Sequence, residues 1–216
     1  MFNFDTNYKN LPAFTKIPAW LRVYNKDICW KVSDIDRNVY LTFDDGPHPI
    51  VTPVILDILL KEKLKATFFC IGSQVEKHPD IYNRIIVEGH VIGNHSFSHR
   101  SGWKMPVEEY VEDVSKASKL INSNLFRPPY GRITPAQFKV LRNQYKIVMW
   151  DILSKDYDAD VTNEQVIKNA TSDLSEGSII VMHDNDKTAG RMENLLPEII
   201  KTILAEGWRF KTLASN

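Results

Sequence analysis

The stretch "NVYLTFDDGPHP" (Asn38–Pro49) predicts a buried β-strand that ends in two adjacent carboxylates. Its first six residues are rich in β-branched and aromatic side chains, which favour strands. Asp44 and Asp45 follow, just before a Gly-Pro turn. Asp, Gly and Pro are also ordinary turn residues, so the pair by itself is compatible with a structural turn as well as with a functional site. The polar clusters elsewhere in the chain decide between the two interpretations.

Strand-like and helix-like segments alternate along the chain. Thr134 before Pro135 predicts a helix start, and Gly89, Gly177 and Gly207 each predict a helix end. The alternation predicts an α/β fold with a parallel sheet covered by helices, in a small, incomplete barrel of about seven units. The predicted strands lie at residues 38–43, 66–72, 90–94, 124–127, 146–150, 178–183 and 209–213, and helical periodicity at residues 51–65, 107–121, 134–144, 163–174 and 192–207.

The composition is that of a globular protein without a nucleic-acid partner. The chain has 216 residues, of which 43% are hydrophobic, and 27 basic side chains balance 27 acidic ones. No block of like charge could neutralise a run of phosphates, so the charge pattern favours a neutral substrate. The chain length fits one domain or at most two, and no boundary between two domains is visible.

The sequence as given carries no targeting signal. The N-terminal residues lack the positive start and apolar run of a secretory signal peptide. No span reaches the roughly 18 apolar residues of a transmembrane helix. We therefore expect a cytoplasmic protein without a membrane span, in which Cys29 and Cys70 stay reduced because disulfides are rare in that compartment. Nothing in the sequence indicates an oligomeric state.

Polar clusters follow five of the predicted strands. In barrels of this kind, the loops at the carboxyl ends of the strands carry the chemistry. Turn residues alone would be spread equally over both ends, so five clusters at one rim indicate a functional site. The clusters are "DDG" (44–46), "HSFSH" (95–99), "RPPYG" (127–131), "DILSKDYD" (151–158) and "HDND" (183–186).

His95 and His99 are spaced for a metal site. Because they are four residues apart, a single helical turn would aim both imidazoles at one point. Two imidazoles and one carboxylate, with one open position, describe a catalytic zinc-type site, and Asp45 can supply the carboxylate. Asp44 would then face the attacking water as a general base. The alternative, two unrelated surface histidines, loses weight because an acidic cluster lies on the same rim.

Five motifs, in order, resemble those of the polysaccharide deacetylases of the NodB-like carbohydrate esterase group, between Val39 and Leu213. That family implies a distorted, incomplete (β/α) barrel, with residues 38–216 as the catalytic domain. We interpret residues 1–37 as an irregular extension that packs on it. In the family the first aspartate of the first motif is the catalytic base and the second binds metal, as do both histidines of the second motif. The motifs are "TFDDG" (42–46), "HSFSH" (95–99), "RPPYG" (127–131), "DYD" (156–158) and "IIVMHD" (179–184).

The resemblance also implies roles for the later motifs. It makes Arg127 the residue that holds the base, the Tyr130 backbone N–H part of an oxyanion hole, and His183 the general acid. Asp156 would orient His183, and a carboxylate partner favours the imidazolium that an acid requires. Structural alternatives are a surface arginine at 127 and a solvated loop aspartate at 156. The family commonly has tryptophan where this chain has Tyr157, which puts the shape of the sugar pocket in question.

Together these features predict a metal-dependent carbohydrate N-deacetylase acting on N-acetylglucosamine units of a glycan. The implied cofactor is a divalent metal, zinc first, with cobalt or nickel as alternatives. A hydrolase of a small non-sugar amide and a non-catalytic glycan-binding module are the rival hypotheses, although no key catalytic position is lost. His48, His78 and His90 are interpreted as structural, since each lacks a paired ligand at a useful spacing.

Overall fold

Nine strands form one sheet in the residues that this computed structural model describes, 15–16 and 27–213. The paired strands run parallel, in the order β1-β6-β5-β4-β3-β2-β8-β7, and β9 pairs with the start of β2. The strands are β1 (Ile28–Cys29), β2 (Asn38–Asp44), β3 (Thr67–Cys70), β4 (Val91–Asn94), β5 (Leu125–Phe126), β6 (Lys146–Val148), β7 (Ile152–Leu153), β8 (Ile179–His183) and β9 (Arg209–Lys211).

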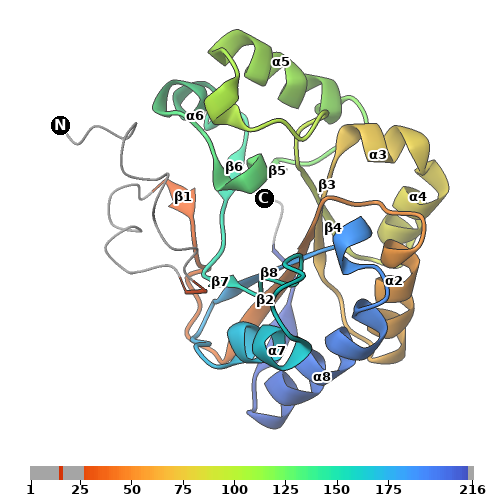
Figure 1. The fold of residues 1–216 in the computed structure, drawn as a ribbon. Helices are drawn as coiled ribbons and strands as arrows, with labels where there is room; N and C mark the ends of the chain where they lie inside the picture. Colours follow the sequence, from red (N-terminus) through yellow and green to blue (C-terminus); the bar gives the residue numbers. More distant parts are fainter. Residues whose placement is uncertain (1–14, 17–26, 214–216) are drawn as a thin grey trace.

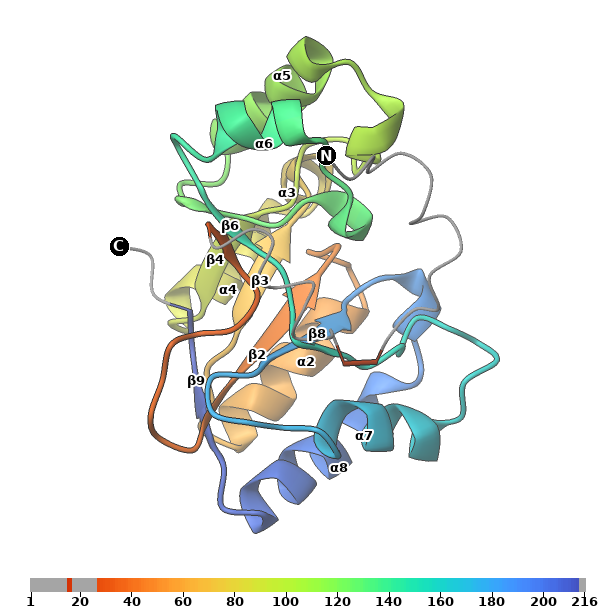
Figure 2. The same cartoon turned by 90° about the vertical axis from the view of Figure 1, so that its left-hand side faces the viewer.

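Helices cover the outside of the curled sheet, as the two views in Figure 1 and Figure 2 show. Helices α5 and α6 lie beyond one end of the sheet, and α7 and α8 pack together beyond the other. The helices are α2 (Val51–Lys61), α3 (Gly72–Lys77), α4 (Pro79–Val87), α5 (Val107–Ser118), α6 (Pro135–Leu141), α7 (Asn163–Thr171) and α8 (Met192–Ala205), with short 3-10 turns η2 (Gly102–Lys104), η3 (Pro129–Gly131) and η4 (Asp186–Thr188).

The central strand β2 sets the position of the site. All seven of its residues are buried, and it pairs with β3 on one side and β8 on the other. Its last residue, Asp44, is in register with Phe69 of β3 and His183 of β8. Because parallel strands end at the same edge of a sheet, this register brings two of the candidate catalytic side chains to one level.

The core fills the space between the sheet and the α2–α8 pair. Phe43 of β2 stacks on Phe68 of β3 with ring centroids 5.1 Å apart. Ile55 and Leu59 of α2 and Ile199 of α8 are fully buried against them. Their i, i+4 spacing places the two α2 side chains on one face of that helix, so the periodicity of the sequence explains which face is covered.

The predicted α/β barrel is confirmed, and its seven predicted strands are all present. Strands β1 and β7, each two residues long, add to them. Thr134 caps α6 with a reciprocal hydrogen-bonded box, as its place before Pro135 predicts. Gly177 is different: it lies beyond the end of α7, and a Cβ there would be 1.9 Å from the carbonyl oxygen of Val32. Its positive φ of 81° therefore serves a tight turn into β8 rather than a helix end.

The predicted extension, residues 1–37, falls mostly outside the described residues. Of its described part, Ile28 and Cys29 form the edge strand β1, paired with β6. Cys29 and Cys70 are free thiols. None of the described helices combines the length and apolar character needed to cross a bilayer. The predicted division into residues 1–37 and 38–216 and the predicted cytoplasmic location stay predictions.

Candidate active site

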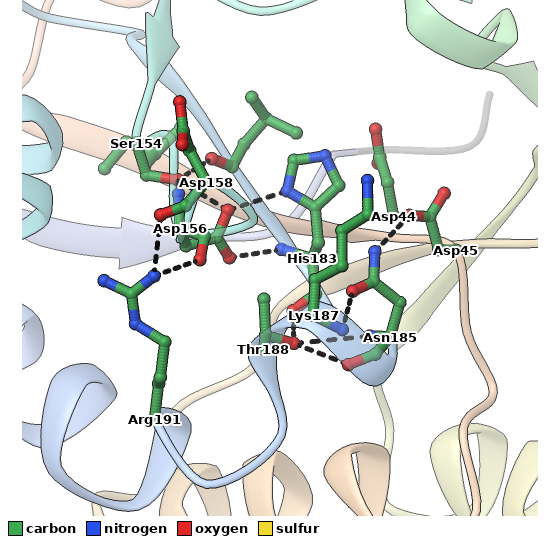
Figure 3. A network of polar contacts seen from close by, with 12 residues as sticks. Asp44, Asp45, Ser154, Asp156, Asp158, His183, Asn185, Lys187, Thr188 and Arg191 are labelled. Carbon is green, nitrogen blue, oxygen red and sulfur yellow. Dashed lines mark hydrogen bonds and ion pairs between the residues drawn. The ribbon is translucent and has the colours of Figure 1, made fainter. Parts of the chain in front are cut away.

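The candidate residues meet at the carboxyl edge of the sheet. Asp44 is the last residue of β2, and Asp45 follows it. His95 follows β4, and Arg127 follows β5. His183 is the last residue of β8. Figure 3 shows Asp44, Asp45 and His183 side by side with the loop that carries Asp156. The topology of the sheet thus brings together segments that lie up to about 140 residues apart in the sequence. Asp44 and His183, which are in register on neighbouring strands, are one such pair.

Asp45, His95 and His99 form a group that could hold a metal ion. Their ligand atoms all lie within 4.8 Å of one another. Asp45 Oδ1 is 3.0 Å from His99 Nε2 and 3.5 Å from His95 Nε2. His95 Nδ1 lies 2.7 Å from the Arg127 carbonyl oxygen, which can only accept a hydrogen bond, so that nitrogen carries the proton. His95 Nε2 is therefore left with the lone pair that a metal needs, and the donor set fits a divalent cation.

The two imidazoles converge through a loop rather than through the helical turn that their spacing suggested. Residues 95–100 contain no helix, and Ser96 and His99 have positive φ values of 64° and 56°. The loop is held by Asn94 Oδ1, which accepts from the Ser96 N–H at 2.8 Å, and by Ser96 Oγ, which accepts from the His99 N–H at 3.0 Å. Left-handed backbone in non-glycine residues is uncommon and concentrates at functional sites.

The carboxylate of Asp45 stays ionised. Burial opposes its charge, but the neighbouring imidazoles of His95, His99 and His183 outweigh burial and hold the Asp45 pKa well below its usual range. Asn185 adds a further donor, with Nδ2 2.6 Å from Asp45 Oδ2. The outer oxygen of Asp45 is thus occupied by an amide, and Oδ1 faces the two imidazoles.

Arg127 holds Asp44 in a buried ion pair. The guanidinium has no exposed surface, and its Nη1 donates to Asp44 Oδ1 at 2.6 Å and to Thr42 Oγ1 at 2.8 Å. Nη2 donates to the Met149 carbonyl at 2.9 Å. The ring of Phe69 lies 4.1 Å below the guanidinium carbon. Arg127 is therefore not the surface arginine of the alternative interpretation. Asp44 pairs with this guanidinium, whereas its sequence neighbour Asp45 contacts the two imidazoles.

His183 is oriented by Asp156 through two contacts. His183 Nδ1 is 2.7 Å from Asp156 Oδ1, and the backbone N–H of His183 donates to Asp156 Oδ2 at 2.7 Å. Ser154 Oγ donates to Asp156 Oδ1 at 3.0 Å. Asp156 is fully buried, so it is not a solvated loop residue. Burial works against the imidazolium, but Asp156, with smaller contributions from Asp45 and Asp44, raises the pKa of His183 to about 9.

Two tyrosines stand beside these groups. The Tyr130 ring lies 4.7 Å from the His99 ring, and its hydroxyl is 3.3 Å from His99 Nδ1. Tyr157 contacts His183 edge-on, with centroids 4.8 Å apart. Tyr130 has a positive φ of 60°, so the backbone of η3 turns sharply at this residue. The tyrosines therefore flank the metal-binding group on one side and the imidazole on the other.

The remaining histidines have structural partners. His48 Nε2 is 2.9 Å from Asp186 Oδ1, and its Nδ1 accepts from the Val51 N–H at the start of α2. His90 packs edge-on against Phe68, and burial lowers its pKa to about 4, so it is neutral at physiological pH. His78 lies at the junction of α3 and α4. None of the three belongs to the metal-binding group.

Sequence reasoning missed several supporting residues. Asp184 accepts from the Gly46 N–H at 2.9 Å, and a Cβ at Gly46 would collide with the Asp184 carboxyl group, which explains glycine after the aspartate pair. Asn185 and Ser154 contact Asp45 and Asp156. The partners of Asp184 and Asn185 lie 138 and 140 residues away in the sequence, so no local pattern identifies these two contacts, whereas Ser154 is only two residues from Asp156.

Comparisons with known proteins place these residues in a family context. The family model described as "Polysaccharide deacetylase" matches residues 31–147. The chain is 33% identical over 198 residues to a peptidoglycan-N-acetylglucosamine deacetylase of Bacillus cereus, covering 87% of this chain and 91% of that protein. It is 30% identical over 202 residues to the chitooligosaccharide deacetylase of Azorhizobium caulinodans, covering 85% and 96%. The crystal structure of the Bc1960 peptidoglycan N-acetylglucosamine deacetylase with a bound N-hydroxybenzamide superposes with a TM-score of 0.84 and 33% identity, covering 91% and 95%.

The contact between Asn185 and Asp45 predicts a change in metal affinity. Asn185→Ser keeps an oxygen that can cap η4 but removes the donor to Asp45 Oδ2. We expect the affinity for a divalent metal to fall about 10- to 100-fold, the usual effect of losing such a partner. Competition titration with a metal-binding dye measures it, and Asn143→Ser, at an exposed position after α6, is the control. Equal affinities for Asn185→Ser and Asn143→Ser would mean that the contact has no effect on the metal.

The contact between Asp156 and His183 predicts a shift in pH dependence. The His183 pKa of about 9 is raised, so the protonated imidazole is present below that pH and lost above it. Asp156→Asn removes the charge that supports protonation, and we expect the alkaline limb of the rate profile to move down by roughly 1–3 pH units. NMR titration of the His183 ring measures the same shift without activity. An unchanged pKa would exclude Asp156 as the cause.

Proposed function

The chain belongs to the polysaccharide deacetylase family, and from that premise we propose that it hydrolyses the acetamido group of N-acetylglucosamine units in a glycan, releasing acetate and a free amine. One observation carries the proposal. A single sheet edge holds a carboxylate fixed by a buried arginine, an imidazole fixed by a buried carboxylate, and the Asp45, His95 and His99 group. These are the parts that amide hydrolysis needs: a base, an acid and an electrophile.

Asp44 acts as the general base in this proposal. It is 3% exposed and accepts a charge-assisted hydrogen bond from Arg127, so its position is fixed at the edge of the site. The bond uses Oδ1, which leaves Oδ2 to take a proton from the attacking water. Arg127 keeps the carboxylate oriented while the proton moves from water to Oδ2.

His183 acts as the general acid. An amine is a poor leaving group, so the nitrogen must be protonated before the carbon–nitrogen bond breaks. His183 Nδ1 is bound to Asp156, which leaves Nε2 with its proton free to point into the site. Asp156 keeps the imidazole in this orientation and charge state, as a carboxylate does for histidine in other hydrolases.

The proposed cofactor is a divalent cation held by Asp45 Oδ1, His95 Nε2 and His99 Nε2. Zinc is the first choice, because two imidazoles and one carboxylate suit it, and cobalt and nickel are alternatives. When bound, the cation polarises the acetyl carbonyl and makes water more acidic. The Tyr130 backbone N–H is the proposed second stabiliser of the developing negative charge, at a turn that already has left-handed geometry.

Tyr157 keeps one alternative substrate class open. In place of the expected tryptophan, a smaller ring lies against His183. A small non-sugar amide is therefore the second candidate substrate. Acetate release from chitin oligomers, peptidoglycan fragments and simple acetamides separates the two, alongside elemental analysis of the purified protein. A protein without metal that stays inactive with added zinc, cobalt or nickel would refute the proposal.

The two adjacent aspartates predict different mutant phenotypes. Asp45→Asn weakens metal binding, since a neutral amide is a poorer ligand than a carboxylate. Asp44→Asn keeps the metal and an oxygen for Arg127, but lowers turnover about 10²- to 10⁴-fold, the usual contribution of a positioned base. Metal content and kcat are measured together, and thermal unfolding checks that both variants fold. Metal loss in Asp44→Asn but not in Asp45→Asn would reverse the two roles.

The position of Tyr157 predicts a change in substrate preference without a change in chemistry. Tyr157→Trp enlarges the aromatic surface beside His183, and stacking on a sugar depends on that surface. We expect the ratio of kcat/KM values for long and short acetylated oligosaccharides to change, while metal content stays the same. An unchanged ratio across all acetylated sugars tested would show that Tyr157 does not bound the substrate site.

A further inference from the structure

A row of exposed side chains extends outward from the metal-binding group. The Tyr130 ring lies against His99, and the Arg132 guanidinium carbon lies 5.9 Å from the Tyr130 ring centroid. The same guanidinium carbon is 5.0 Å from the ring of Trp103. Tyr130 is 59% exposed, Trp103 is 40% exposed, and Arg132 is also exposed. The row therefore presents two aromatic rings and one cation to solvent, beginning at a metal ligand.

The backbone beneath this row is firmly held. Gln137, fully buried, donates through Nε2 to the carbonyls of Gly102 at 2.9 Å and Met105 at 3.1 Å. A Cβ at Gly102 would be 2.6 Å from the Arg132 carbonyl oxygen, so η2 and the segment after η3 are in direct contact. The Arg132 N–H donates to the Pro129 carbonyl at 3.0 Å. Trp103 on η2 and Arg132 after η3 therefore lie on two segments that are in direct contact, as a preorganised binding surface requires.

The charge of this rim is unusual for the chain. Residues 95–106 and 127–135 contain no Asp or Glu, although the whole chain has as many acidic as basic side chains. Within the described part of the chain, Arg132 forms no ion pair. A guanidinium that stacks on aromatic rings keeps its in-plane N–H groups available, and their fork matches a carboxylate. The exposed cation is therefore placed to meet an anion on a molecule that extends out of the active site.

We propose that Arg132, Trp103 and Tyr130 form a subsite for a carboxylate-bearing sugar next to the sugar that is deacetylated. The rings contact the apolar face of the neighbouring sugar, and Arg132 pairs with its carboxylate. This inference rests on the proposed deacetylase function and narrows its substrate to an acidic glycan, such as one with lactyl ethers or attached peptides. This substrate differs from the neutral one that the overall charge balance favoured. The rim segments carry basic but no acidic side chains, although the whole chain has no net charge.

Steady-state kinetics on matched tetrasaccharides tests the subsite. The substrates are a neutral chitin tetramer, an N-acetylated tetramer with free lactyl carboxylates, and the latter after its carboxylates are reduced to alcohols. We expect Arg132→Gln to raise KM for the lactyl substrate about 5- to 10-fold, as for an exposed charge-assisted pair, with little change in kcat. The two neutral substrates should be unaffected. Arg132→Lys should recover part of the loss, since the charge remains but the fork does not.

Two comparisons identify the source of the carboxylate and provide the control. In a fourth substrate the lactyl groups are amide-linked to short peptides, so the carboxylates lie on the peptide. A larger effect of Arg132→Gln on this substrate would assign the subsite to the peptide, and a smaller one to the lactyl group. Lys61→Gln, at the end of α2 and therefore at the opposite edge of the sheet, is the matched loss of an exposed cation and should leave all four substrates unchanged.

The results that would overturn the inference are distinct from failure of the proposed function. Equal losses in Arg132→Gln on neutral and acidic substrates would make Arg132 a structural residue. A wild-type protein with the same kcat/KM for the lactyl tetramer and its reduced form would exclude carboxylate recognition. A metal-loaded wild-type protein that releases no acetate from any of the substrates would refute the deacetylase proposal itself, and this subsite with it.

Discussion

The buried guanidinium of Arg127 is the interaction on which the site depends. A charge without solvent contact is strongly unfavourable unless every donor finds a partner, and here the partners come from different strands. Asp44 and Thr42 lie on β2, while the carbonyls of Val148 and Met149 lie at the end of β6. The backbone carbonyl of Arg127 accepts a hydrogen bond from His95 Nδ1. One residue thus fixes the side chains of Asp44 and His95 and the spacing of the strand ends, and a substitution there would disturb all three.

The parallel sheet supplies the second constraint. Each strand delivers its terminal residue to the same edge, and the register of β2 with β8 decides that Asp44 and His183 face the same space. Irregular backbone then provides the fine adjustment. Positive φ values at Asp45, Ser96, His99 and Tyr130 occur at the ends of β2, β4 and β5, where each loop must turn a side chain or an N–H inward. The regular sheet sets the level of the site, and the left-handed residues set its geometry.

The sequence predicted the parts of this protein that leave a local signal. The strand of residues 38–44 and the amphipathic helix of residues 51–61 are long enough for periodicity to show. The motifs predicted which side chains gather at the carboxyl edge of the sheet, because these residue types are rare in such clusters. Strand β7 has two residues and therefore no period. The hydrogen bond from Asn185 to Asp45 joins segments 140 residues apart, so it follows from the pairing of β2 with β8 and not from any short pattern.

The loop after β7 both positions the Asp156 carboxylate and carries the Tyr157 ring, and its anchoring makes these two roles independent. Arg191, just before α8, donates to the carbonyls of Asp156, Asp158 and Val161, as the left side of Figure 3 shows for the first two. These bonds hold the main chain, and they do not depend on which side chain occupies position 157. Evolution can therefore exchange the aromatic wall at Tyr157 while the carboxylate beside it stays in place. The surface that this loop offers to a substrate can thus change while the main chain that carries Asp156 stays in place.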